Sequence, residues 1–145
     1  MRWKRAYTTE QLGLPWRVRE DDPSWLMMQS MLVGQQIMSI DLARDNPSTL
    51  PLVLVIAFMD GMVLRVWDRD QTCCEERYMT AESDMSSDVV GAVFLGIDIL
   101  DVPSPDRYNE VQFLHVRTDR SVFVFSTHNI HNGCYEGFDV VATLT

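Results

Sequence analysis

The chain has 145 residues, 46% hydrophobic and 23% charged, a composition that suits one folded domain rather than a disordered segment. Its formal net charge of -9 argues against binding to DNA, RNA or an anionic membrane, because polyanions are bound mainly by clustered lysine and arginine. A small anionic ligand needs only a few positive groups, and eleven of the twelve basic residues are arginines, whose planar fork suits phosphate or carboxylate.

Hydropathy and cysteine content bear on the cellular compartment. No stretch approaches the roughly 20 apolar residues of a membrane span, and the basic N-terminus lacks the apolar run of a signal peptide. Three cysteines, two of them adjacent, make a poor disulfide framework. We therefore expect a cytoplasmic protein with reduced thiols.

The first 30 residues are interpreted as an N-terminal appendage, in which charged residues are mixed with three tryptophans and two prolines. Short helical turns are expected after Thr9 and over 24–32, where Ser24 is a suitable N-cap. This segment can pack on the main body or on another subunit.

The remainder, 31–145, reads as a single β-rich domain. Apolar runs with alternation are typical of strands, Asp60-Gly61 is a strong hairpin signal, and 83–91 suits a short helical turn. The expected strands are 32–42, 52–58, 62–68, 75–80, 92–102, 111–118, 121–127 and 138–144. We predict a mainly β fold, an antiparallel sheet of seven or eight strands.

An internal repeat organises these strands. Segment 32–42 aligns without gaps on 89–99, and hairpin 54–68 aligns on 113–127. With one extra residue in the second loop, Cys73 then falls opposite Cys134, and Glu75 opposite Glu136. We infer two pseudo-repeats, 32–80 and 89–145, related by a pseudo-dyad, so that their polar loops are equivalent and face each other.

Two chemical interpretations of the polar loops 68–77 and 126–138 involve their thiols and imidazoles. His128, His131 and Cys134, with Cys73-Cys74, supply donors for zinc, but adjacent cysteines in an extended segment point to opposite faces. Cys73 or Cys74 beside a histidine can also form a thiol enzyme. We expect no metal and no catalytic residues.

A ligand pocket is the interpretation we favour. Asparagine amides can hydrogen-bond to the donors and acceptors on the edge of a base, and Tyr135 and Phe138 offer ring faces on which a base can stack. Arginines can bind phosphate. The expected pocket residues are His128, Asn129, His131, Asn132, Gly133, Tyr135, Phe138, Arg65, Arg69, Asp70, Cys73, Cys74, Glu75 and Arg77. The competing structural interpretation is a β-connection in which Asn132-Gly133 forms the turn and the two aromatic residues pack into the core.

The order of these motifs resembles a family of small, uncharacterised proteins of bacteriophages and some bacteria. The matching segments are Asp60-Gly61, DQTCCE at 70–75, Val90-Gly91 and NIHNGCYEGF at 129–138. The pattern covers 50–145 and departs from the family at Ile130, where an acidic residue is common, and at Cys134, where an aromatic residue is common.

This resemblance implies a phage or prophage accessory protein in the host cytoplasm, without assigning an activity. By analogy of size and context, such proteins are similar to phage sponges, small oligomers that sequester cyclic nucleotide signals of bacterial immunity. We therefore expect a homo-oligomer that binds a small ligand of this type without cleaving it. The alternatives are an acidic protein-binding inhibitor or virion-associated protein, and a Cys/His-dependent enzyme.

Overall fold

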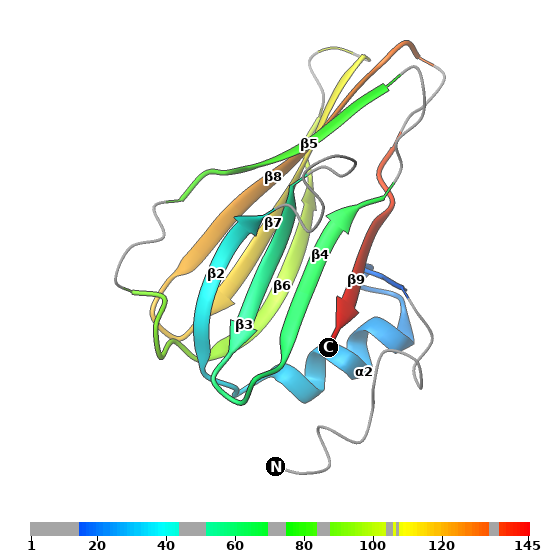
Figure 1. The fold of residues 1–145 in the computed structure, drawn as a ribbon. Helices are drawn as coiled ribbons and strands as arrows, with labels where there is room; N and C mark the ends of the chain where they lie inside the picture. Colours follow the sequence, from blue (N-terminus) through cyan, green and yellow to red (C-terminus); the bar gives the residue numbers. More distant parts are fainter. Residues whose placement is uncertain are drawn as a thin grey trace.

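The computed structural model of the chain shows two antiparallel sheets and one short helix (Figure 1). It describes residues 15–43, 52–69, 75–83, 88–103, 106, 108–133 and 137–145. The elements are β1 (Trp16–Arg17), α2 (Pro23–Leu32), β2 (Ile37–Ala43), β3 (Val53–Phe58), β4 (Val63–Asp68), β5 (Glu75–Ala81), β6 (Phe94–Asp101), β7 (Asn109–Thr118), β8 (Val122–His131) and β9 (Val140–Leu144). The prediction of a mainly antiparallel β fold is confirmed.

The strands are divided between two sheets in a repeated pattern. One sheet has the order β1-β9-β4-β3-β2 and the other the order β5-β8-β7-β6. In each half of the chain three consecutive strands form a meander, and the fourth strand crosses to the other sheet. Thus β5 pairs with β8, and β9 pairs with β4. Each half therefore completes the sheet that the other half begins.

A single hydrophobic core fills the space between the sheets. Alternate residues of the strands point inward, as the pleat requires. Leu54 and Ile56 of β3 and Leu114 and Val116 of β7 belong to this core, and all four are fully buried. Phe58 and Phe94 meet edge to face, with ring centroids 5.5 Å apart.

The two halves join through equivalent backbone contacts. Gly34 donates its N–H to the carbonyl of Phe94 at 2.9 Å, and Gly91 donates to the carbonyl of Ile37 at 2.8 Å. Both glycines have a positive φ, 90° and 81°, a conformation that costs other residues free energy. Each contact lies just before a register shift in the adjoining strand.

The register corrects one detail of the sequence alignment. Leu54 pairs with Leu42 and Val66, whereas the residue in the equivalent place of β7 is Leu114, between Ile99 and Phe125. The ungapped alignment placed Phe113 there, one residue too early. The cause is a difference in turn length. Residues 58–62 lie between the paired residues Ala57 and Val63 of the first hairpin, whereas residues 118–121 lie between Arg117 and Val122 of the second. The second turn is therefore one residue shorter. A shift of one residue exchanges the two faces of a strand.

The described part of the N-terminal segment contributes to the core. Trp16, Val18, Trp25 and Met28 are buried in the same cluster as the strands, and α2 contacts β6 and β1. Helix α2 is capped by Asp22 rather than by Ser24, because the Asp22 carboxylate accepts hydrogen bonds from the backbone N–H of Ser24 and Trp25.

Two of the expected helical turns fall partly or wholly outside the described ranges. Residues 88–91 form turns, while 84–87 and the segment after Thr9 lie outside the described residues. Within the described ranges, no helix reaches the length and apolarity needed to cross a membrane.

Candidate functional site

The predicted loop 68–77 contributes a buried ion-pair cluster centred on Arg77. Its guanidinium donates to Asp68 and Glu75, both at 2.7 Å, and to the carbonyl of Gly137 at 2.8 Å. The three charged side chains are 3%, 4% and 1% exposed. Burial alone would lower the pKa of Arg77, but the hydrogen bonds to Glu75 and Asp68 raise it above its ordinary value. The guanidinium therefore stays charged inside the protein.

A second polar network adjoins this cluster through Gly137. The Glu110 carboxylate accepts from the Gly137 N–H at 2.9 Å and from the Asn129 amide at 3.3 Å. The Gly137 carbonyl accepts from both Arg77 and Asn129, so it connects the two networks. Glu110 was not among the residues selected from the sequence, because nothing near it forms a motif.

His131 is oriented by this second network. The Gly133 N–H donates to His131 Nδ1 at 2.9 Å, so the neutral ring carries its proton on Nε2. That nitrogen lies 2.9 Å from a Glu110 oxygen, although the ring N–H is not aligned with it. We interpret His131 as a side chain fixed by its neighbours.

His128 lies on the other face of the sheet. The predicted loop 126–138 is a strand as far as His131, and neighbouring side chains of a strand point to opposite faces. His128 stacks on Tyr78 with ring centroids 4.5 Å apart, and its Nε2 is 3.0 Å from the Ser126 hydroxyl. Burial lowers the pKa of His128, against the attraction of Glu82. The structure therefore does not bring His128 together with His131 in one site.

The remaining predicted residues fall into three places. Arg65 lies on the outer face of its sheet, where it donates to the Thr145 hydroxyl at 2.9 Å. Arg69 and Phe138 lie beside the start of β9, and Asn132 and Gly133 follow β8 in a turn. Asp70, Cys73, Cys74 and Tyr135 lie outside the described residues.

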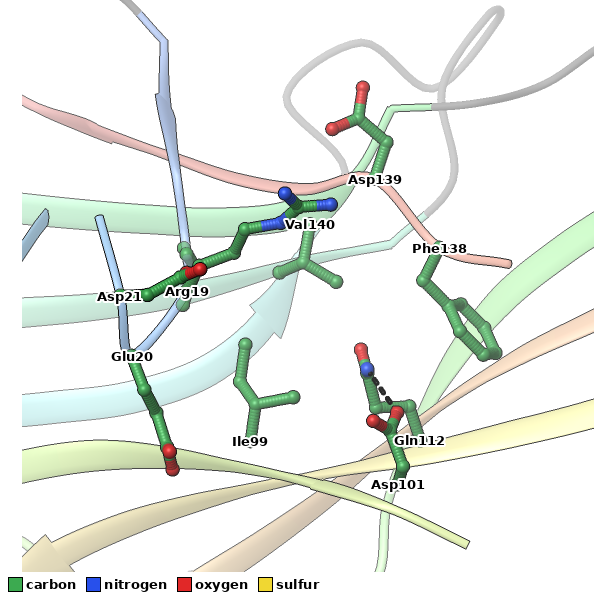
Figure 2. Close-up of a pocket in the computed structure, with 10 residues that line it drawn as sticks. Arg19, Glu20, Asp21, Ile99, Asp101, Gln112, Phe138, Asp139 and Val140 are labelled. Atoms are coloured by element: carbon green, nitrogen blue, oxygen red, sulfur yellow. Dashed lines mark hydrogen bonds between the residues drawn. The ribbon is translucent and has the colours of Figure 1, made fainter. Parts of the chain in front are cut away.

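A cavity lies elsewhere, beside the connection from β1 to α2 (Figure 2). Its volume is about 460 Å³. The lining residues are Val18, Arg19, Glu20, Asp21, Ile99, Asp101, Gln112, Phe138, Asp139 and Val140. They come from both sheets, so the cavity opens into the gap between the two layers. Its floor is apolar, and charged groups surround it.

Arginines gather at the β9 side of this cavity. Arg69 Nε donates to Asp139 at 2.5 Å, and Arg17 Nε lies 3.7 Å from the other oxygen of the same carboxylate. Arg19 makes no ion pair with any described residue, and Figure 2 shows its guanidinium extending over Val140 toward Asp139. Arg17 and Arg69 thus contact one carboxylate, and Arg19 extends toward it.

Carboxylates occupy the opposite side. Figure 2 shows Glu20 and Asp101 on the Ile99 side of the cavity, away from Asp139. The Gln112 amide donates to Asp101 Oδ1 at 2.6 Å. The side-chain oxygen of Gln112, Oε1, accepts no hydrogen bond from the described part of the chain. Acceptor oxygens therefore line the Ile99 side of the cavity, whereas the β9 side combines guanidinium groups with the carboxylates of Asp21 and Asp139.

Sequence reasoning found only part of this cavity. Phe138 was a candidate, and Arg69 belongs to its charged surroundings. Arg17 and Arg19 were missed, although their spacing of two residues places them on one side of an extended segment. Asp101 and Gln112 carry no local motif, because the cavity combines segments distant in the chain.

Metal binding finds no support in the described residues. Among them, no group of three histidine, cysteine, aspartate or glutamate side chains could hold an ion. The cysteines that motivated the zinc interpretation lie outside the described ranges.

These features define a two-sheet antiparallel β protein with a charged cavity between the layers. The chain belongs to the family DUF7448, a domain of unknown function, whose family model matches residues 27–141. The match confirms an uncharacterised family, and it begins after the cavity residues 18–21. No curated protein and no solved structure matches the chain.

Proposed function

We propose that this protein binds a small nucleotide-type ligand in the cavity between its sheets and sequesters it without cleaving it. The observation that carries the proposal is one cavity lined by apolar side chains, an aromatic ring and Arg19, with Arg17 and Arg69 held beside it by Asp139. Small-molecule sites have this composition, and about 460 Å³ lies within their usual size range.

The arginine end suits a phosphate. Asp139 and the lining carboxylate Asp21 offset part of the positive charge of Arg17, Arg19 and Arg69, and the guanidinium groups outnumber the carboxylates at that end. The Arg17 and Arg69 side chains are 53% and 39% exposed, and they can turn toward a ligand while keeping part of their contact with Asp139. Guanidinium groups bind phosphate through paired, charge-assisted hydrogen bonds.

The apolar side suits the base. Phe138 is half-buried at the cavity and offers a ring on which a base can stack, and Ile99 and Val140 form an adjoining apolar surface. Base stacking on an aromatic side chain contributes roughly 1–3 kcal/mol. In this proposal Phe138 and Arg69 keep the roles expected for them, while Arg19 takes the phosphate role considered for Arg65 and Arg77.

Sequestration rather than turnover is supported by the lining. None of the described lining residues is a thiol, a hydroxyl nucleophile or a histidine. Two of its carboxylates, Asp101 and Asp139, are held by hydrogen bonds from Gln112 and Arg69. In the phage setting that the motif resemblance implies, the ligand would be a cyclic nucleotide signal of host immunity, and the binding protein would be a homo-oligomer.

Native mass spectrometry of the full chain tests this proposal. The protein is incubated with mononucleotides and cyclic dinucleotides, and the bound species is weighed before and after denaturation. We expect a nucleotide that is released unchanged, and recovery of a cleaved product would contradict sequestration. The same spectra give the number of subunits.

Arginine variants locate the site. Arg19→Ala and Arg69→Ala should each weaken nucleotide binding roughly 10- to 100-fold, the usual worth of a hydrogen bond to a charged group. The matched control is Arg65→Ala, which removes an arginine from the outer face of the same sheet. Equal weakening by all three variants would indicate general electrostatic attraction instead of a site.

A protein partner is the second candidate function, and a surface feature favours it. The outer face of the β5-β8-β7-β6 sheet carries exposed Leu100, Val122 and Ile130, with half-buried Tyr78 and Phe113. Leu100 pairs directly with Phe113 on this face, and adjoining apolar side chains on a sheet face are typical of interaction surfaces. A stable complex in a pull-down, weakened by Val122→Lys and unaffected by nucleotide, would support this alternative.

A further inference from the structure

The cavity contains an oriented carboxylate at the end opposite its arginines. Asp101 is the last residue of β6 and pairs directly with Gln112 of β7. The amide of Gln112 donates to Asp101 Oδ1 at 2.6 Å, which restrains the carboxylate plane and leaves Oδ2 without a donor from Gln112. Asp101 itself is exposed, so a ligand in the cavity can reach it.

From this geometry we infer that Asp101 reads the base of the bound nucleotide and selects guanine. The inference rests on the proposed function, because it names the ligand class for the same cavity. A carboxylate offers only acceptor oxygens, and two of them side by side match two parallel N–H donors. Among the common bases, guanine presents such an edge, through its ring N–H and its exocyclic amino group.

Adenine meets the same carboxylate differently. Its corresponding edge carries one amino donor and one ring-nitrogen acceptor, so the acceptor faces a carboxylate oxygen and loses its hydrogen bond. Leaving a polar group desolvated and unpaired is unfavourable, and sites that read hydrogen-bonding groups discriminate strongly for this reason. Guanine is therefore favoured over adenine at this end of the cavity.

The arrangement of the other lining groups fixes the orientation of the ligand. Figure 2 shows the Phe138 ring beside the Asp101–Gln112 pair, with Arg19 and Asp139 on the far side of Val140. A base stacked on Phe138 can place its edge at Asp101 while its phosphate points to the arginines. The reverse orientation would put phosphate beside Asp101 and Glu20, where like charges repel.

Titration calorimetry with three mononucleotides tests the selectivity of the full chain at one salt concentration. The probes are GMP, IMP, which keeps the ring N–H but lacks the amino group, and AMP. We expect affinity to fall in that order, with GMP bound roughly 10- to 100-fold more tightly than AMP, the usual worth of a bidentate base contact. Equal affinities for GMP and AMP would overturn the inference and leave the proposed function standing. Failure of every nucleotide, including cyclic dinucleotides, would overturn both.

Two substitutions identify the residue responsible. Asp101→Asn replaces one acceptor by a donor at an exposed position, so the ratio of GMP to AMP affinity should fall to about one while the protein stays folded. Glu76→Gln removes a carboxylate from the exposed outer face of β5, and it should leave that ratio unchanged. A ratio that survives Asp101→Asn would overturn the assignment. Gln112→Met should lower the ratio partly, because it removes only the group that orients Asp101.

Discussion

Arg77 and Asp68 form a buried ion pair between the two sheets. Asp68 ends β4 in one sheet, Arg77 lies on β5 in the other, and the two side chains meet at 2.7 Å with almost no exposure. Glu75 and the Gly137 carbonyl take further hydrogen bonds from the same guanidinium. The pair therefore links the layers at the place where each half of the chain crosses to the other sheet.

Loss of this guanidinium should destabilise the protein strongly. In Arg77→Met, Asp68 and Glu75 remain buried without their shared counter-charge, and breaking a buried pair in this way costs about 3–5 kcal/mol. Urea unfolding followed by circular dichroism would measure the change. Arg77→Lys keeps the charge but not the fork and should lose less. A cost below about 1 kcal/mol for Arg77→Met would contradict the role we assign to the pair.

The cap of α2 gives a local test of the N-terminal segment. Asp22→Ala removes the acceptor for two backbone N–H groups of the first turn, and such a change costs about 0.5–2 kcal/mol. The free energy of unfolding of the full chain is the measurement. Ser24→Ala is the control, because Ser24 lies inside the helix and should change stability by less than about 0.5 kcal/mol. The reverse ranking would restore Ser24 as the cap.

The fold was predictable as far as local patterns determine it. Alternation in 62–68 and the Asp60-Gly61 turn located a hairpin, because both signals arise from neighbouring residues. The division into two sheets was not predicted. Hydrophobic periodicity shows which face of a strand is buried, but it does not show which other strands are its neighbours in the sheet. Glu75 and Arg77 illustrate the difficulty: their charges are typical of an exposed face, yet they occupy the buried one.

The candidate site was predictable only in part for a related reason. Asn129, His131, Glu75 and Arg77 do come together, because β5 and β8 are neighbours. However, their side chains are engaged with one another and with Glu110 or Asp68. The cavity that remains open is built by Arg19, Asp101 and Gln112, which approach one another only after the sheets have packed. No local spacing encodes such an arrangement.

Equivalent glycines in the two halves offer a test of the backbone contacts that join them. Gly34→Ala and Gly91→Ala each force a side chain into a positive-φ conformation, which costs roughly 1–2 kcal/mol. We expect similar losses from both, measured by urea unfolding, because the two positions make matching hydrogen bonds to Phe94 and Ile37. Gln35→Ala, one residue after Gly34, should be nearly neutral. A loss at one glycine only would show that the two junctions differ energetically.

His128 should make stability depend on pH. Its pKa is lowered in the folded protein by burial, whereas the unfolded chain titrates near the ordinary value of 6.5. Below pH 6.5 His128 therefore binds a proton in the unfolded chain but not in the folded protein. The free energy of unfolding thus falls as the pH drops toward the folded pKa of His128. Above pH 6.5 this contribution is complete and constant. Glu82 acts in the same direction, but below its own ordinary value of 4.5, because hydrogen bonds from Ser126 and Thr80 lower its pKa.

Urea titrations between about pH 5 and pH 7.5 would measure this dependence. His128→Phe keeps an aromatic ring against Tyr78 but cannot bind a proton, so its stability should vary less with pH than that of the parent protein. The difference between the two curves isolates His128 from the other histidines. Parallel curves would mean that His128 titrates alike in the folded and unfolded chains, and that burial beside Tyr78 does not restrict its protonation.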